Sequence, residues 1–334
     1  NQFRDMSFVR KILSYSLDFL CVLAFCVHIC KNKDENKLKI FTCEYCTILT
    51  YYVLFTMICI FCPGVKNKWE SVIVMSEHDI YMLDMIAKYV GRFAWNGFAG
   101  YGATFSCSLG VFFVIMSFNH SYDNKDNHKK SFRYYFFLLV CVTGNFLYGR
   151  TGLIVSLIIK LSIKRGRLDI LFVVVFFGVI LFSIIFYLKE NVPVMKSLYN
   201  WVFEPFINWG DGKGFSADSL TSLKKMYKKP SISTFLIGDG YYTDPITGGY
   251  YNSIDVGVLR LIYYWGILPT TFVYLIMFNA FKKSVLYCDV FSAFAFFVIF
   301  VLFEMKGEIA ITLTTYLVCM LSICKNTRNK ILDY

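Results

Sequence analysis

The sequence predicts an all-α, polytopic integral membrane protein, and three observations support this class. Of the 334 residues, 57% are hydrophobic and 19% are aromatic. Only 17% are charged, which is too few for the surface of a soluble chain of this length. The hydrophobic residues also form continuous blocks of about 20, the length of a membrane-spanning helix, without the alternation of a barrel strand. We therefore expect a single membrane domain over residues 1–334, with about nine or more transmembrane helices.

The order of the apolar blocks defines nine candidate spans. They lie at about residues 12–30, 38–62, 97–118, 134–149, 151–163, 168–188, 256–279, 284–303 and 309–323. Arg150 interrupts the apolar run between Tyr134 and Ile163, and we interpret this run as a short hairpin. A single span there would place the basic residues 164–167 outside and reverse every later span. Counting back along the nine spans places the basic N-terminal segment on the periplasmic side. Because basic segments belong on the cytoplasmic side, at least one further span is expected before Asn1.

Basic residues are concentrated in the short connectors between the spans. Five short connectors carry 17 Lys or Arg against four acidic residues, whereas the two long connectors carry 11 of each. The five are residues 31–39, 119–133, 160–167, 280–283 and 324–330. Because basic connectors stay in the cytoplasm, residues 63–96 and 189–255 are predicted to be the first and the large periplasmic loop. The basic excess therefore reports orientation, and no nucleic-acid partner is predicted.

Four cysteines reproduce the CxxC…CxxC spacing of a zinc ribbon, namely Cys43, Cys46, Cys59 and Cys62. All four lie in one hydrophobic run, and on one helix the two pairs are about 24 Å apart. One zinc ion needs its sulfur ligands at ~2.3 Å, so these cysteines are interpreted as small apolar residues at a helix interface. The four histidines form no ligand spacing, and neither a metal site nor a cofactor is predicted.

The loop at residues 189–255 has internal organisation. Its first part carries four aromatic side chains that suit the headgroup level of a membrane, Trp201, Phe203, Phe206 and Trp209. Ser216 or Asp218 is then placed to cap a short helix. One face of that helix carries Leu220, Leu223 and Tyr227, and the other carries Lys224, Lys225 and Lys228. The helix is expected either to lie along the membrane surface or to pack over the loop as an ordinary surface helix.

The end of this loop leads into a span that contains an arginine. Residues 236 to 269 read LIGDGYYTDPITGGYYNSIDVGVLRLIYYWGILP. Asp255 lies where the chain enters the span, and Arg260 follows five residues later inside hydrophobic sequence. Ionisable groups at such depth face a protein cavity, pair with one another or bind a charged substrate. A structural tether between Asp255 and Arg260 is the alternative to a substrate site.

This segment resembles the bacterial O-antigen polymerases of the Wzy family. The resemblance is strongest in Gly238-Asp239-Gly240, Tyr250-Tyr251 and Asp255 to Arg260, followed by Trp265-Gly266-Ile267. It extends weakly to Gly91-Arg92 through Gly102, to Gly149 through Gly152, and to Glu304-Met305-Lys306-Gly307.

The resemblance implies a GT-C-like glycosyltransferase of the bacterial inner membrane whose active site faces the periplasm. Such an enzyme moves a chain from undecaprenyl pyrophosphate onto the non-reducing end of a lipid-linked repeat unit. Its partners are that lipid-linked oligosaccharide, membrane lipids and a chain-length regulator protein. The implied pyrophosphate-binding residues are Arg92, Arg150 and Arg260. The implied base is Asp255, and Glu304 and Glu308 are the alternative candidates for the base. The implied sugar-binding residues are Tyr250, Tyr251 and Asp239.

Two other functions are compatible with the same resemblance or composition. An O-antigen ligase shares the lipid-linked donor but typically uses a histidine in its outer loop, and residues 189–255 contain none. A transporter or flippase of lipid-linked oligosaccharide is expected to carry ionisable groups along the whole membrane crossing and to consist of two related sequence halves. Here the ionisable residues collect near the predicted outer mouth, which favours the polymerase.

Overall fold

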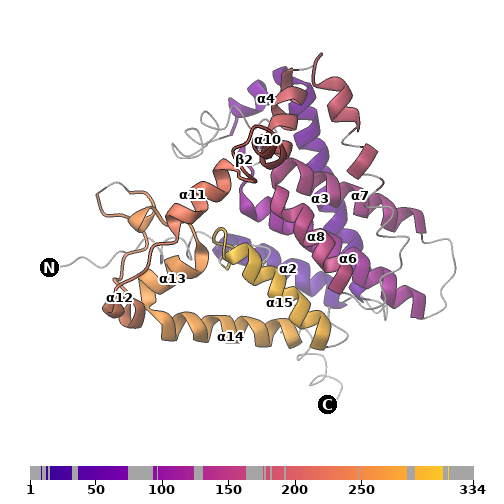
Figure 1. Cartoon of the computed structure of the whole chain (residues 1–334). Coiled ribbons are helices and arrows are strands. Elements are labelled where there is room, and N and C mark those ends of the chain that lie inside the picture. The colour runs from indigo at the N-terminus through magenta and orange to yellow at the C-terminus, as the bar shows by residue number, and fades with distance from the viewer. Residues whose placement is uncertain are drawn as a thin grey trace. The chain divides into compact units, whose positions relative to one another are not determined.

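The computed structural model describes residues 9, 13, 16–31, 37–73, 93–95, 97–123, 131–162, 176, 178–180, 183–191, 193–246, 248–283, 290–310 and 315. These residues are mostly helical, which confirms the all-α class (Figure 1). The chain divides into two compact units. One unit comprises Lys39–Ala217, and the other comprises Asn1–Leu38 together with Asp218–Tyr334.

The unit Lys39–Ala217 is built around packed helices. Its elements are α3 (Lys37–Phe61), α4 (Pro63–Glu70), β1 (Phe93–Ala94), β2 (Gly97–Phe98), α6 (Tyr101–Asp123), α7 (Ser131–Tyr148), α8 (Arg150–Ser162) and α10 (Pro193–Gly210). Helices α6, α7 and α8 pack against one another. The span predicted from residue 97 starts late, because β1 and β2 form an antiparallel pair before α6 begins.

The predicted hairpin is present as two helices, α7 and α8, that meet at Gly149. Asn145 Nδ2 of α7 donates to Ser156 Oγ of α8 at 2.9 Å, and both side chains are buried. A Cβ on Gly152 would overlap the Asn145 side chain, so the glycine allows the two helices to approach closely.

Cysteines pack against glycines between α6 and α7. A Cβ on Gly110 would lie 2.5 Å from Cys141 Sγ, and one on Gly144 would lie 2.5 Å from Cys107 Sγ. Each glycine therefore makes room for a cysteine of the neighbouring helix. Among the four cysteines of the zinc-like spacing, Cys46 and Cys59 are buried on α3, Cys43 is partly exposed, and Cys62 follows the end of α3 and is exposed.

The second unit carries the segment that the resemblance singles out. Its elements are α2 (Ser16–Lys31), α11 (Asp218–Met226), α12 (Ile232–Ile237), the 3-10 turn η3 (Tyr251–Ser253), α13 (Gly257–Trp265), α14 (Ile267–Lys283) and α15 (Val290–Glu304). Helices α12, α13 and α14 contact one another, and α14 runs beside α15 (Figure 1).

Residues 256–279, predicted as one span, do not form one continuous helix, because the chain breaks between α13 and α14. Gly266 adopts φ +84°, where a side chain is strained, and a Cβ there would overlap the Leu236 carbonyl oxygen. The Asp239 N–H donates to the Tyr263 carbonyl at 2.6 Å. The turn after α12 thus satisfies a backbone acceptor at the end of α13, and the break depends on this tertiary contact.

One described helix is long and apolar enough to cross a membrane, over Lys39–Phe61. Shorter apolar helices lie within or close to six other predicted spans, at Leu20–Ile29, Tyr101–Ser117, Phe132–Tyr148, Arg150–Ile159, Gly178–Leu188 and Ala293–Glu304. Most of the spans predicted at 168–188 and 309–323 falls outside the described residues. The number of spans therefore stays a prediction.

The predicted large loop contains more helix than expected. The short helix appears as α11, but α10 occupies 18 residues where the sequence predicts no helix. Leu223 of α11 packs against a cluster formed by Ile254, Val256 and Tyr263. Leu220 and Tyr227 on the same face are each 44% exposed, and no residue of α11 is buried. Both expectations for α11, a helix on the membrane surface and a helix packed over the loop, therefore stay predictions.

Candidate functional site

The centre of the candidate site is the guanidinium of Arg260, in the first turn of α13. Its side chain is 6% exposed, and Nη1 donates to Glu308 Oε2 at 2.8 Å. Asp255 Oδ1 lies 4.0 Å from the same nitrogen. The guanidinium also lies over two tyrosine rings, 4.0 Å from the Tyr242 centroid and 4.4 Å from that of Tyr250. Two carboxylates and two aromatic faces therefore stabilise one buried positive charge.

Part of this guanidinium is not used by the fold. Arg260 Nε is buried, and among the described residues it has no hydrogen-bond partner. Leaving a buried donor unsatisfied costs about 1–3 kcal/mol, and more when the group is charged. Such a donor is suited to a ligand oxygen.

The two carboxylates next to Arg260 differ in accessibility. Glu308 is 4% exposed and accepts hydrogen bonds from both Arg260 and the Tyr242 hydroxyl. The Asp255 side chain is 21% exposed and lies in the connection between η3 and α13. Asp255 is therefore the carboxylate of this pair that a substrate can reach more readily.

Glu304, the last residue of α15, is fully buried and holds the turn that carries Glu308. Its Oε2 accepts from the backbone N–H groups of Ile309 at 2.7 Å and Ala310 at 2.9 Å. Its Oε1 accepts from the Tyr274 hydroxyl at 3.2 Å. These bonds offset the desolvation of the carboxylate and fix the turn after α15.

Gly257 lets α13 approach this turn. A Cβ on Gly257 would collide with Glu304 Oε1 and would lie 2.9 Å from the Cα of Glu308. The first turn of α13, which also carries Arg260, therefore packs directly on the turn that carries Glu308. The absence of a side chain at residue 257 is what makes the Arg260–Glu308 distance attainable.

Asp239 connects the segments around the tyrosines. Its Oδ1 accepts from Thr234 Oγ1 at 2.7 Å, and its Oδ2 accepts from the Tyr251 hydroxyl at 3.2 Å. The Tyr251 ring stacks on Tyr241, with centroids 5.5 Å apart. Burial, together with the neighbouring Asp239 charge, raises the pKa of Tyr251, so its hydroxyl stays protonated and donates.

The tyrosines of this loop form two pairs with different surroundings. Thr243 and Tyr250 form an isolated antiparallel bridge, which brings the two Tyr-Tyr sequences together. Tyr242 and Tyr250 both contact Arg260, whereas Tyr241 and Tyr251 stack on each other. Half-exposed Tyr250 offers an aromatic surface beside the buried charge.

Arg150 lies in the other unit, at the first position of α8. Its Nη2 donates to Glu204 Oε2 of α10 at 2.9 Å, and its guanidinium lies 5.4 Å from the centroid of a Trp201 ring. It repeats the combination of a carboxylate and an aromatic ring that surrounds Arg260. Arg92, the third predicted pyrophosphate ligand, lies outside the described residues.

The structure thus brings together seven of the nine predicted site residues in one unit, namely Asp239, Tyr250, Tyr251, Asp255, Arg260, Glu304 and Glu308. Tyr242 and Gly257 are not among the site residues predicted from the sequence. The spacing of the two Tyr-Tyr pairs about a Pro- and Gly-containing turn is a signal for Tyr242, because a hairpin there faces one tyrosine of each pair to the same side.

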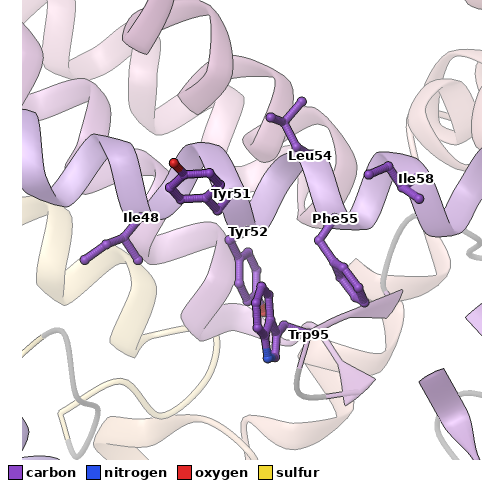
Figure 2. Close-up of a pocket in the computed structure, with 7 residues that line it drawn as sticks. All are labelled: Ile48, Tyr51, Tyr52, Leu54, Phe55, Ile58 and Trp95. Atoms are coloured by element: carbon purple, nitrogen blue, oxygen red, sulfur yellow. The ribbon is translucent and has the colours of Figure 1, made fainter.

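An apolar cavity of 580 Å³ lies on α3 in the unit Lys39–Ala217 (Figure 2). Its lining is aromatic or aliphatic throughout, from Ile48, Tyr51, Tyr52, Leu54, Phe55, Ile58 and Trp95. This cavity offers apolar contact but no carboxylate or cation among its lining residues. The cluster around Arg260 is therefore the better candidate for chemistry. Comparisons with protein-family models, with curated proteins and with solved structures found no match.

Proposed function

We propose that the chain is a polytopic inner-membrane glycosyltransferase of the O-antigen polymerase type. It transfers an undecaprenyl-pyrophosphate-linked chain onto the non-reducing end of a lipid-linked repeat unit, at the periplasmic face. The proposal is supported by the apolar composition, the basic short connectors and the resemblance around Asp239 to Arg260. The observation that carries it is the buried Arg260, whose Nε has no hydrogen-bond partner among the described residues and whose Nη1 lies 4.0 Å from the more accessible Asp255.

The proposed reaction assigns one role to each of these two residues. The acceptor hydroxyl oxygen attacks the anomeric carbon of the donor sugar, and the bond from that carbon to the pyrophosphate oxygen breaks. The hydroxyl proton passes to Asp255, and the departing undecaprenyl pyrophosphate keeps the bonding electron pair. Arg260 binds the charge that develops on this leaving group, for which a guanidinium is well suited.

The remaining residues of the cluster position these groups. Glu308 neutralises Arg260 before a substrate arrives, and a phosphate oxygen replaces part of its role. Tyr250 and Tyr251 supply aromatic faces for the sugars, while Asp239 holds Tyr251 in place. Arg150, in the other unit, is proposed to bind a second phosphate group. No cofactor is needed, because the donor sugar is already activated.

Deletion of the gene in its own strain tests this function and separates it from the alternatives. Loss of a polymerase leaves lipopolysaccharide with a core and one repeat unit. Loss of a ligase leaves bare core, and loss of a flippase prevents repeat units from reaching the periplasm. Complementation with the wild-type chain is expected to restore long chains, whereas a bare core after deletion would show that the chain is not the polymerase.

A further inference from the structure

Helix α12 has the reverse of the usual surface pattern, because its apolar side chains are exposed and its polar threonine is buried. Ile232 is 82% exposed and Ile237 is 78% exposed, and Phe235 and Leu236 are exposed as well. Thr234, in the middle of the helix, is 7% exposed. A contiguous apolar group on so short a helix is unfavourable in water and marks an interaction surface.

The polar groups of Thr234, in the middle of α12, are satisfied within the protein. The Ser231 side chain accepts from the Thr234 N–H at 3.1 Å and so caps the N-terminus. Thr234 Oγ1 donates to Asp239, and the Gly238 N–H donates to the Thr234 carbonyl at 2.8 Å. These groups of Thr234 therefore stay satisfied when the helix enters hydrocarbon.

The neighbouring elements extend the apolar surface and add positive charge beside it. Helix α14, which contacts α12, exposes Leu268, Phe272, Leu275 and Ile276. Two exposed lysines, Lys228 and Lys229, closely precede α12 in the sequence. Lysines next to an inserted apolar segment are attracted to anionic lipid headgroups, at about 1 kcal/mol per residue. Charge and apolar surface together match a lipid bilayer better than another protein.

We infer that α12 inserts Ile232, Leu236 and Ile237 into the outer edge of the bilayer hydrocarbon, with the preceding lysines at the headgroups. Its six residues are about 9 Å long, so the helix inserts without spanning. The inference rests on the membrane location proposed above. It makes α12 an element of the predicted periplasmic loop that touches lipid. The Asp239 turn follows directly, so this anchor holds the tyrosine loop at the level of lipid-linked pyrophosphates.

Site-specific photo-crosslinking tests the inference on the full chain. A photoreactive amino acid is placed at residue 232 or 237, and the protein is reconstituted in vesicles of zwitterionic and anionic phospholipid. Matched positions are Phe272 on the exposed face of α14, as the lipid-facing reference, and Ser222, exposed on α11, as the aqueous reference. Lipid adducts are measured by mass spectrometry. Positions 232 and 237 are expected to give adducts at the level of position 272, and position 222 is expected to give none.

The reference positions separate failure of this inference from failure of the proposed membrane location. Lipid adducts at 272 but none at 232 and 237 would overturn the insertion of α12. A protein crosslink at 237, whether to a second copy or within the chain, would overturn it as well. Absence of adducts at 272 too would contradict the membrane location itself, and with it the premise of the inference.

Discussion

Arg260 Nη1 and Glu308 Oε2 lie 2.8 Å apart, although 48 residues separate them in the sequence. Both side chains are almost completely buried, so this ion pair ties α13 to the turn after α15. A buried pair is costly to desolvate and contributes little net stability by itself. In the part of the chain that the structure describes, Arg260 Nε has no hydrogen-bond partner, so it is open to the charged ligand proposed above.

Arg260→Lys is expected to abolish long-chain polymerisation and to leave core plus one repeat unit. Lysine keeps the charge but loses the planar fork that binds a carboxylate and a phosphate together, and it fits less well between two tyrosine rings. The lipopolysaccharide ladder is the measurement, with the protein amount checked by immunoblot. Arg133→Lys, at an exposed arginine of α7, is the matched control and should preserve the ladder. Normal chains from Arg260→Lys would exclude the pyrophosphate role.

Glu308→Leu is expected to destabilise the protein by about 3–5 kcal/mol, because it leaves the buried Arg260 charge without its closest partner. The double variant Arg260→Met with Glu308→Leu should recover part of that loss, since it removes both charges. Thermal unfolding in detergent measures both changes. Equal stability of Glu308→Leu and the wild type would show that the ion pair is not formed in solution.

Gly257→Ala is expected to lower stability by about 1–3 kcal/mol, because the new methyl group overlaps the Glu304 carboxylate and pushes α13 away from Glu308. The same substitution at Gly102 on α6 meets no atom within 4 Å. Gly102→Ala should therefore be neutral or slightly stabilising. Equal unfolding temperatures for the two variants would contradict the close contact at residue 257.

The periplasmic location of residues 189–255 predicts the reactivity of single cysteines introduced into a cysteine-free background. A cysteine at Ser216 should react with a membrane-impermeant thiol reagent in intact spheroplasts. A cysteine at Lys283, the last residue of α14, should react only after the membrane is permeabilised. The reverse pattern would invert the topology derived from the basic connectors.

Most helices follow from apolar runs, but the break at Gly266 does not. Hydropathy is continuous from Val256 to Asn279, so only Gly266 and Pro269 mark the break locally, and residues 236–239 then close the end of α13. By contrast, Arg150 marks the boundary between α7 and α8, because a charge in an apolar run is a local signal.

In the candidate site too, some residues are predictable from neighbouring sequence, whereas others depend on contacts between distant segments. Asp255 and Arg260 were identifiable as ionisable residues at the edge of an apolar segment. The partner of Arg150 was not, because Glu204 lies on α10, in a stretch predicted to be a loop. Which tyrosine of each Tyr-Tyr pair faces Arg260 depends on the bridge between Thr243 and Tyr250.

Asp255→Asn is expected to give a stable protein that makes only single-repeat lipopolysaccharide. The amide keeps the shape of the side chain but cannot take the acceptor proton, and Glu308 continues to neutralise Arg260, so folding and chemistry are separated. Asp211→Asn, at an exposed residue of the same predicted loop, is the matched control and should polymerise normally. Glu304→Gln should act mainly on stability, because the Glu304 carboxylate is enclosed by its own turn. If Asp255→Asn makes long chains while Glu308→Gln is stable but inactive, the base belongs to the turn after α15 and not to the entrance of α13.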